Sequence, residues 1–88
     1  MQRQVDKVID GDTFRVKRKV NGSNYIRLPG FDAPEINASG GKLAKDRLAR
    51  AIGKNVTLKP KGRSYGRVVA EVRHNRRNVS KTMKKYGY

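Results

Sequence analysis

Two short acidic clusters stand out in a very basic chain. Asp10-Gly11-Asp12-Thr13 and Asp32-Ala33-Pro34-Glu35 hold four of the seven acidic residues, although the chain has 22 Lys and Arg residues and a formal net charge of +15. Carboxylates that only served solubility would be spread among the basic residues, so this clustering indicates a local role such as holding a cation. Hard oxygen ligands of this kind suit calcium or magnesium.

The basic residues indicate what such a cation would meet. They run from Arg3 to Lys85 and are not confined to a tail, which predicts a folded basic surface. We expect DNA, RNA or both as the partner, because phosphates bind such a surface and release counterions. A membrane partner is not expected, since no segment pairs the charge with a strongly apolar helical face. The sequence points to no protein partner, and we expect a monomer.

The remaining composition limits the class of protein. A chain of 88 residues fits a single domain, which we place at residues 1–88. The absence of cysteine excludes disulfides, thiolate chemistry and cysteine-based zinc sites. No stretch resembles a signal peptide or reaches the length of a membrane span, so we expect a soluble chain, whose compartment the sequence does not indicate.

Alternating apolar residues predict five short strands. Two strands lie between Gln4 and Val20 and join at Asp10-Gly11, and the others are Tyr25–Leu28, Val56–Lys59 and Arg67–Arg73. A Gly-rich basic loop is expected over Pro60–Gly66. A small chain with this many strands avoids exposed sheet edges by closing, which predicts a mainly β (α+β) fold: a five-stranded, partly open barrel of the OB-fold type.

Helical spacing predicts one main helix and a short C-terminal helix. Ala44, Leu48, Ala51 and Ile52 share one face of the main helix, which we expect Ser39 or Asn37 to cap and Gly53 to end. Asp46 and Arg50 would form a surface pair on it. The second helix is expected over Ser80–Tyr86, with Ser80 as its cap.

Several motifs occur in a characteristic order along nearly the whole chain. They are Val8-Ile9-Asp10-Gly11-Asp12-Thr13, Arg27-Leu28 through Asp32-Ala33-Pro34-Glu35, the Gly41–Gly53 helix leading into Lys54-Asn55-Val56, Tyr65-Gly66-Arg67, and Tyr86-Gly87. This set resembles the staphylococcal nuclease family, also called thermonuclease-like. The resemblance implies a five-stranded barrel with helices and calcium-dependent cleavage of DNA and RNA.

The resemblance also implies a metal site and a base. Asp12 and Asp32 match the carboxylate ligands of calcium, with the backbone carbonyl of Ala33 as a third ligand. Calcium takes six to eight oxygen ligands, so waters and a substrate phosphate would complete this set. Glu35 matches the general base or water-positioning carboxylate, a role that suits a carboxylate beside a metal.

The resemblance assigns the phosphate contacts to two arginines. Arg27 and Arg67 match the family's phosphate-binding residues, and Tyr65 matches a residue that contacts the nucleotide. The planar guanidinium binds phosphate bidentately, as this role requires. The implied reaction is sugar-nonspecific hydrolysis of the 5′ P–O bond, which leaves 3′-phosphate products.

Other polar and aromatic residues have simpler interpretations. We expect Asp10 to form the turn before Asp12 and His74 to lie at the surface. Tyr86 and Tyr88 are expected to pack near the end of the chain.

The chain also departs from the family pattern. Compared with the best-known member of the family, Ala33 replaces a threonine but keeps the backbone carbonyl, and Arg63-Ser64 replace Asp-Lys. The sequence also stops at Tyr88, where that member continues through further tyrosines and a long final helix. Two alternative functions therefore stay open. One is a catalytically silent nucleic-acid-binding module of the same fold, and the other is a ribosome-associated basic barrel.

Overall fold

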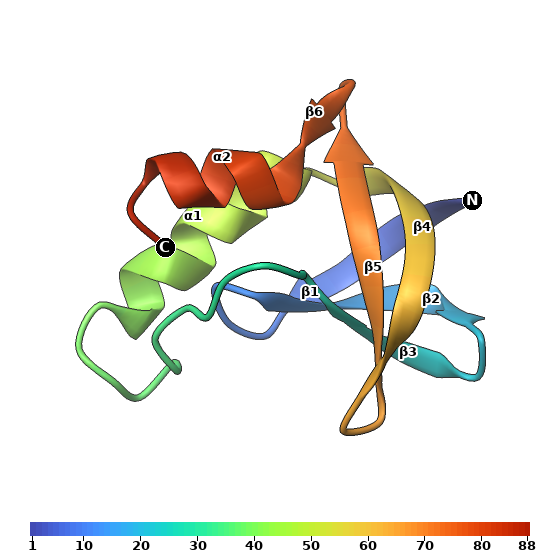
Figure 1. Ribbon diagram of the computed structural model, residues 1–88, viewed down its shortest axis with the longest axis horizontal. Coiled ribbons are helices and arrows are strands. Elements are labelled where there is room, and N and C mark those ends of the chain that lie inside the picture. The colour runs from blue at the N-terminus through green and yellow to red at the C-terminus, as the bar shows by residue number, and fades with distance from the viewer.

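A barrel of β-strands and a pair of helices form the structure, a computed structural model that describes residues 1–88. In chain order the elements are β1 (Gln2–Val8), β2 (Thr13–Val20), β3 (Ser23–Arg27), α1 (Gly41–Ile52), β4 (Asn55–Ser64), β5 (Arg67–His74), β6 (Arg77–Asn78) and α2 (Val79–Lys85). The barrel strands occupy one side of the molecule, and α1 and α2 pack against each other on the other side (Figure 1). Neither helix combines the length and the apolar character that crossing a bilayer would take.

The sheet closes through one parallel pairing. Its strand order is β3-β2-β1-β4-β5-β6, and β3 also pairs with β5 in parallel register, with Ile26 opposite Val68 and Arg27 opposite Val69. Closure leaves few free edges, as expected for so small a sheet. The predicted five-stranded barrel is therefore confirmed, and the two-residue β6 is an addition at the edge of β5.

Inward-pointing apolar residues of the strands and the apolar face of α1 form one common core. Val68, Ala70 and Val72 point inward from β5 and are fully buried, as their alternation predicted. Leu48 and Ile52 bring the apolar face of α1 into the same cluster of 15 buried residues. Because α1 and α2 rest on this core, the helices hold the loops that leave the barrel in defined positions.

The predicted loop over Pro60–Gly66 is wrong. β4 continues to Ser64 and pairs with β5 beyond the proline, with a register irregularity between Pro60 and Gly62. An irregularity of this kind lets a strand accept proline and glycine without losing its pairing. Only Tyr65 and Gly66 form the turn, and both have positive φ angles of 50° and 77°.

The predicted helix caps are also wrong, whereas Gly53 ends α1 as expected. Gly40, with φ of 81°, occupies the N-cap position of α1, and no side chain caps the helix. The Gly41 N–H instead donates to the backbone carbonyl of Ala38 at 3.0 Å. Asn78 caps α2 by accepting the Lys81 N–H at 3.1 Å. The expected cap residue Ser80 instead donates its hydroxyl to the Pro29 carbonyl, which ties α2 to the loop after β3. On α1, Asp46 and Arg50 form no ion pair within 4.0 Å.

Candidate active site

Strand register places the predicted site residues at one end of the barrel. Thr13 at the start of β2 pairs with Arg27 at the end of β3, and Arg27 pairs with Val69 near the start of β5. An open cleft of about 330 Å³ lies there, lined by Asp10, Asp12, Arg27, Asp32, Ala33, Glu35 and Arg67. The structure thus brings six of the seven predicted site residues into one cleft.

Asp12 is the buried carboxylate of this cleft, with 6% of its surface exposed. Its Oδ1 accepts the Thr13 hydroxyl at 2.9 Å, and its Oδ2 accepts the Ala33 N–H at 3.0 Å. The second bond joins the β1–β2 turn to the loop after β3, although the two residues are 21 positions apart. A buried carboxylate needs such donors, so these contacts orient Asp12 before any ligand binds.

Arg27 joins the two aspartates. Its Nη2 donates to Asp32 Oδ1 and lies 3.5 Å from Asp12 Oδ2. Its Nη1 donates to the carbonyls of Leu28 and Phe31, the latter at 2.9 Å. The Arg27 side chain is only 15% exposed, whereas that of Asp32 is 94% exposed. Arg27 therefore fixes the backbone between β3 and Asp32 in addition to carrying charge into the cleft.

Arg67 enters the cleft from β5 and is less constrained. Its Nε donates to the Ser64 carbonyl and its Nη1 to the Thr13 hydroxyl, both at 3.2 Å. Thr13 thus bridges Arg67 to the buried Asp12, because the same hydroxyl donates to Asp12. Nη2 of Arg67 has no protein partner, which leaves donors free for an anion.

Glu35 is exposed, and its carboxylate has no hydrogen bond or ion pair in the structure. Its backbone, by contrast, is held firmly. The Glu35 carbonyl accepts the Ala38 N–H at 2.9 Å and faces Gly41, where a Cβ would lie 1.8 Å from it. A free carboxylate on a fixed backbone can accept a proton from a water molecule in the cleft.

Gly11 allows three segments to meet behind the aspartates. A Cβ on Gly11 would lie 2.6 Å from the Cβ atoms of both Ala33 and Ala44. The β1–β2 turn, the Asp32 loop and α1 therefore pack too closely for any other residue at this position.

Asp10 forms the turn, as predicted, by accepting the Asp12 N–H on its Oδ1 at 3.1 Å. Burial raises the pKa of its carboxyl above the ordinary value of 3.8, and the neighbouring Asp12 carboxylate raises it further. Backbone N–H groups of Asp12 and Thr13 oppose this increase. Ionising the Asp10 carboxyl therefore costs more free energy in the fold than in water.

The donor set suits a hard divalent cation. The Asp12 and Asp32 carboxylates already flank one cationic nitrogen, Nη2 of Arg27, so their oxygens converge on a common position. No group of three or more His, Cys, Asp or Glu side chains lies close enough to hold a metal. The Asp12 and Asp32 carboxylates alone do not complete a metal site, so a cation between them would need further oxygen ligands.

Tyr65 is the predicted site residue that lies outside the cleft. It occupies the turn between β4 and β5, where it is 97% exposed. Thr13 and Gly41 are two residues of the site whose roles the sequence did not reveal. Thr13 is part of the Asp-Gly-Asp-Thr motif, and the Gly40-Gly41 pair at the start of α1 is the signal that marks the tight backbone contact with Glu35.

Comparison with known proteins agrees with this architecture. The profile of the family described as "Staphylococcal nuclease homologue" matches residues 25–88. The chain belongs to the staphylococcal nuclease family. The matched range of this family includes Arg27, Asp32, Ala33, Glu35 and Arg67, whereas Asp12 lies before it.

Two curated relatives extend the similarity over almost the entire chain. An "Uncharacterized endonuclease" of Haemophilus influenzae is 37% identical over 86 residues, and "Endonuclease YhcR" of Bacillus subtilis is 34% identical over 101 residues; each alignment covers 96% of this chain. The chain spans 48% of the length of the first relative and 8% of the second. Its staphylococcal nuclease barrel therefore corresponds to one part of each relative.

Proposed function

We propose that this chain is a single nuclease domain, residues 1–88, that hydrolyses phosphodiester bonds of DNA and RNA with calcium and without selecting the sugar. The observation that carries the proposal is the convergence of the Asp12, Asp32 and Glu35 carboxylates with the Arg27 and Arg67 guanidinium groups in one cleft. A net charge of +15 brings a polyanion to this cleft. Membership of the family and the endonuclease names of both relatives support the same activity.

Asp12, Asp32 and the carbonyl of Ala33 would hold the cation. Bound there, calcium supplies Lewis-acid stabilisation of the negative charge that grows on the phosphoryl oxygens. The burial of Asp12 and its bond to the Ala33 N–H keep the two sides of the site together. Nη2 of Arg27 lies between the two carboxylates in the structure, so binding of the cation would require the Arg27 side chain to move aside. Asp32 is exposed and supplies the side that is open to substrate.

Arg67 and Arg27 would stabilise the phosphate to different degrees. Arg67 keeps Nη2 free and offers its guanidinium edge to two phosphoryl oxygens. Arg27 donates both Nη1 hydrogens to backbone carbonyls and one Nη2 hydrogen to Asp32, and Nη2 also lies 3.5 Å from Asp12, so fewer of its donors are available to a phosphate. We therefore assign the principal phosphate contact to Arg67 and a combined positioning and charge role to Arg27.

Glu35 would accept a proton from the attacking water while the oxygen of that water forms a bond to phosphorus. The bond between phosphorus and the 5′ oxygen then breaks, the 5′ oxygen takes a proton from solvent water, and the phosphate stays on the 3′ side of the product. Tyr65, at the exposed β4–β5 turn, would contact the nucleotide beside the cleft.

A digestion assay on DNA and RNA tests the proposal. Activity should require calcium, disappear in chelator, leave 3′-phosphate ends, and fall by about 10²- to 10⁴-fold in Glu35→Gln. Full activity in chelator, or undiminished activity of Glu35→Gln, would contradict the mechanism. Nucleic-acid binding without cleavage at any calcium concentration would identify a silent binding module instead.

A further inference from the structure

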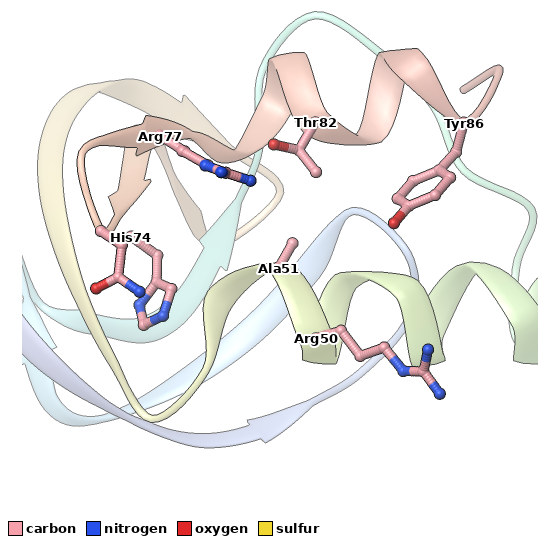
Figure 2. Close-up of a pocket in the computed structure, with 7 residues that line it drawn as sticks. Arg50, Ala51, His74, Arg77, Thr82 and Tyr86 are labelled. Atoms are coloured by element: carbon pink, nitrogen blue, oxygen red, sulfur yellow. The ribbon is translucent and has the colours of Figure 1, made fainter.

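A second basic hollow lies between the two helices, away from the cleft. Its lining includes Arg50 on α1, His74 at the end of β5, Arg77 on β6 and Tyr86 after α2, and its volume is about 510 Å³ (Figure 2). Adjoining hollows share Arg77 on one side and Arg50 and Tyr86 on the other. We call these three neighbouring hollows together the α1–α2 groove.

Four cations of this groove have no polar partner within the protein. Arg50, Arg77, Lys81 and Lys85 form no ion pair within 4.0 Å and no side-chain hydrogen bond. The segment from residue 76 to residue 88 contains no acidic residue, and the groove has one carboxylate, Asp46, at its end beside Tyr86. Side chains whose positive charge and N–H donors have no partner in the protein are suited to binding a polyanion.

The cations also lie in sequence along the groove. Lys81 and Lys85 are one helical turn apart on α2, about 6 Å along the axis. Arg77 precedes them on β6 and lines the same hollow. A row of this kind can follow successive phosphates of one strand, whereas a single free anion would need only one of its members.

An aromatic ring accompanies the row of charge. Tyr86 is half-exposed, and the guanidinium carbon of Arg47 lies 4.4 Å from its ring centroid. From the sequence, Tyr86 and Tyr88 are both expected to pack near the end of the chain. Tyr88 does pack against the core, but Tyr86 presents its ring to the groove, where a base could stack on it.

The groove and the cleft are separate sites. They share no lining residue. Arg67 and His74 stand at the two ends of β5, seven residues apart, which is about 23 Å along an extended strand. A strand must therefore extend several nucleotides beyond the bond in the cleft to reach the groove.

We propose that the α1–α2 groove is a second nucleic-acid site, which binds the phosphate backbone of a DNA or RNA strand beyond the nucleotides held in the cleft. The site extends the proposed nuclease function and rests on it for the identity of the ligand. It increases affinity for long strands and leaves the chemistry of the cleft to Glu35 and its neighbours.

Binding of a fluorescein-labelled 30-nucleotide strand in chelator tests the site without any cleavage. The variant is Arg50→Gln/Arg77→Gln/Lys81→Gln, and its matched control is Lys17→Gln/Arg18→Gln/Lys19→Gln, three exposed charges on β2. If the groove holds three phosphates, the slope of log K against log salt should fall by about 2 in the groove variant, at roughly 0.7 for each lost contact. An equal loss of affinity for the strand in the two variants, or unchanged affinity in the groove variant, would overturn the proposal.

Two further measurements separate this site from the cleft and from other ligands. With calcium, the groove variant should raise KM for the 30-nucleotide strand more than KM for a dinucleotide, and equal changes would overturn the proposal. If neither the wild type nor either variant cleaves the strand, but the groove variant still binds it more weakly than the control variant does, the proposed nuclease activity is refuted and the proposed binding site is retained. Vesicles rich in phosphatidylserine provide the last comparison. If the protein binds them as tightly as it binds the strand, and the groove variant loses this binding, the proposal is overturned in favour of a membrane surface. Thermal unfolding by circular dichroism checks that both variants fold.

Discussion

Gly41 lies directly against the backbone carbonyl of Glu35, where an added Cβ would stand 1.8 Å from the oxygen. No flexible side chain can yield there, because the opposing atoms are backbone. The first residue of α1 therefore sets the position of the candidate base, and the glycine at this position has a function that its sequence context only hints at.

Gly41→Ala should displace Glu35 and strain the start of α1. We expect the free energy of unfolding to fall by about 1–3 kcal/mol, as for other overpacked sites, and nuclease activity to fall further than stability explains. Urea titration and the digestion assay measure the two effects. Gly62→Ala is the matched control, because a Cβ at Gly62 meets nothing within 4 Å. Equal behaviour of the two variants would refute the positioning role of Gly41.

Thr13→Val should disconnect Arg67 from Asp12. The valine keeps the buried shape but removes the hydroxyl that donates to Asp12 and accepts from Arg67. Leaving a buried carboxylate short of a donor should lower the free energy of unfolding by about 1–3 kcal/mol. Activity should fall as well, and Thr13→Ser should restore both quantities. Failure of serine to rescue would show that the methyl packing of Thr13, and not its hydroxyl, is what matters.

The two cleft arginines should respond differently to replacement by lysine. Arg27→Lys removes bonds to two carbonyls and to Asp32, so we expect a measurable loss of stability as well as of activity. Arg67→Lys should mainly reduce kcat, by about 10²- to 10³-fold, because its free donors face the substrate. Thermal unfolding and steady-state kinetics separate the two cases. A stability loss in Arg67→Lys larger than that in Arg27→Lys would reverse the assignment.

Asp10 should make the stability of the metal-free protein depend on pH. Its pKa is raised in the fold, so its contribution to stability is fully present below the ordinary value of 3.8 and is lost as pH rises through the raised pKa. Asp10→Asn keeps the acceptor for the Asp12 N–H and removes the charge. In chelator, the variant should be more stable than the wild type at neutral pH, and the difference should shrink as pH falls. Urea titrations at several pH values measure it, and a less stable variant at pH 7 would contradict the effect of burial.

Local patterns in the sequence were sufficient for most elements of the barrel. Val68, Ala70 and Val72 alternate in β5, and Leu48 and Ile52 lie at helical spacing, so burial follows from chemistry within a few residues. The predictions failed where long-range contacts compete with local preference. Pro60–Ser64 stays in β4 because β5 pairs with it, and Ser80 leaves its capping role because Pro29 offers a carbonyl 51 residues away.

The candidate site divides in the same way. The sequence alone predicted which residues could carry chemistry, because scarce carboxylates and paired motifs are visible without coordinates. Only the tertiary structure decided how they meet. The parallel pairing of β3 with β5 aligns Arg27 with Val69, two residues from Arg67, and the Ala33 N–H reaches Asp12 across 21 positions. Barrel closure and close glycine contacts depend on every strand at once, so no local pattern encodes them. The groove between α1 and α2 likewise exists only because two helices distant in sequence pack together.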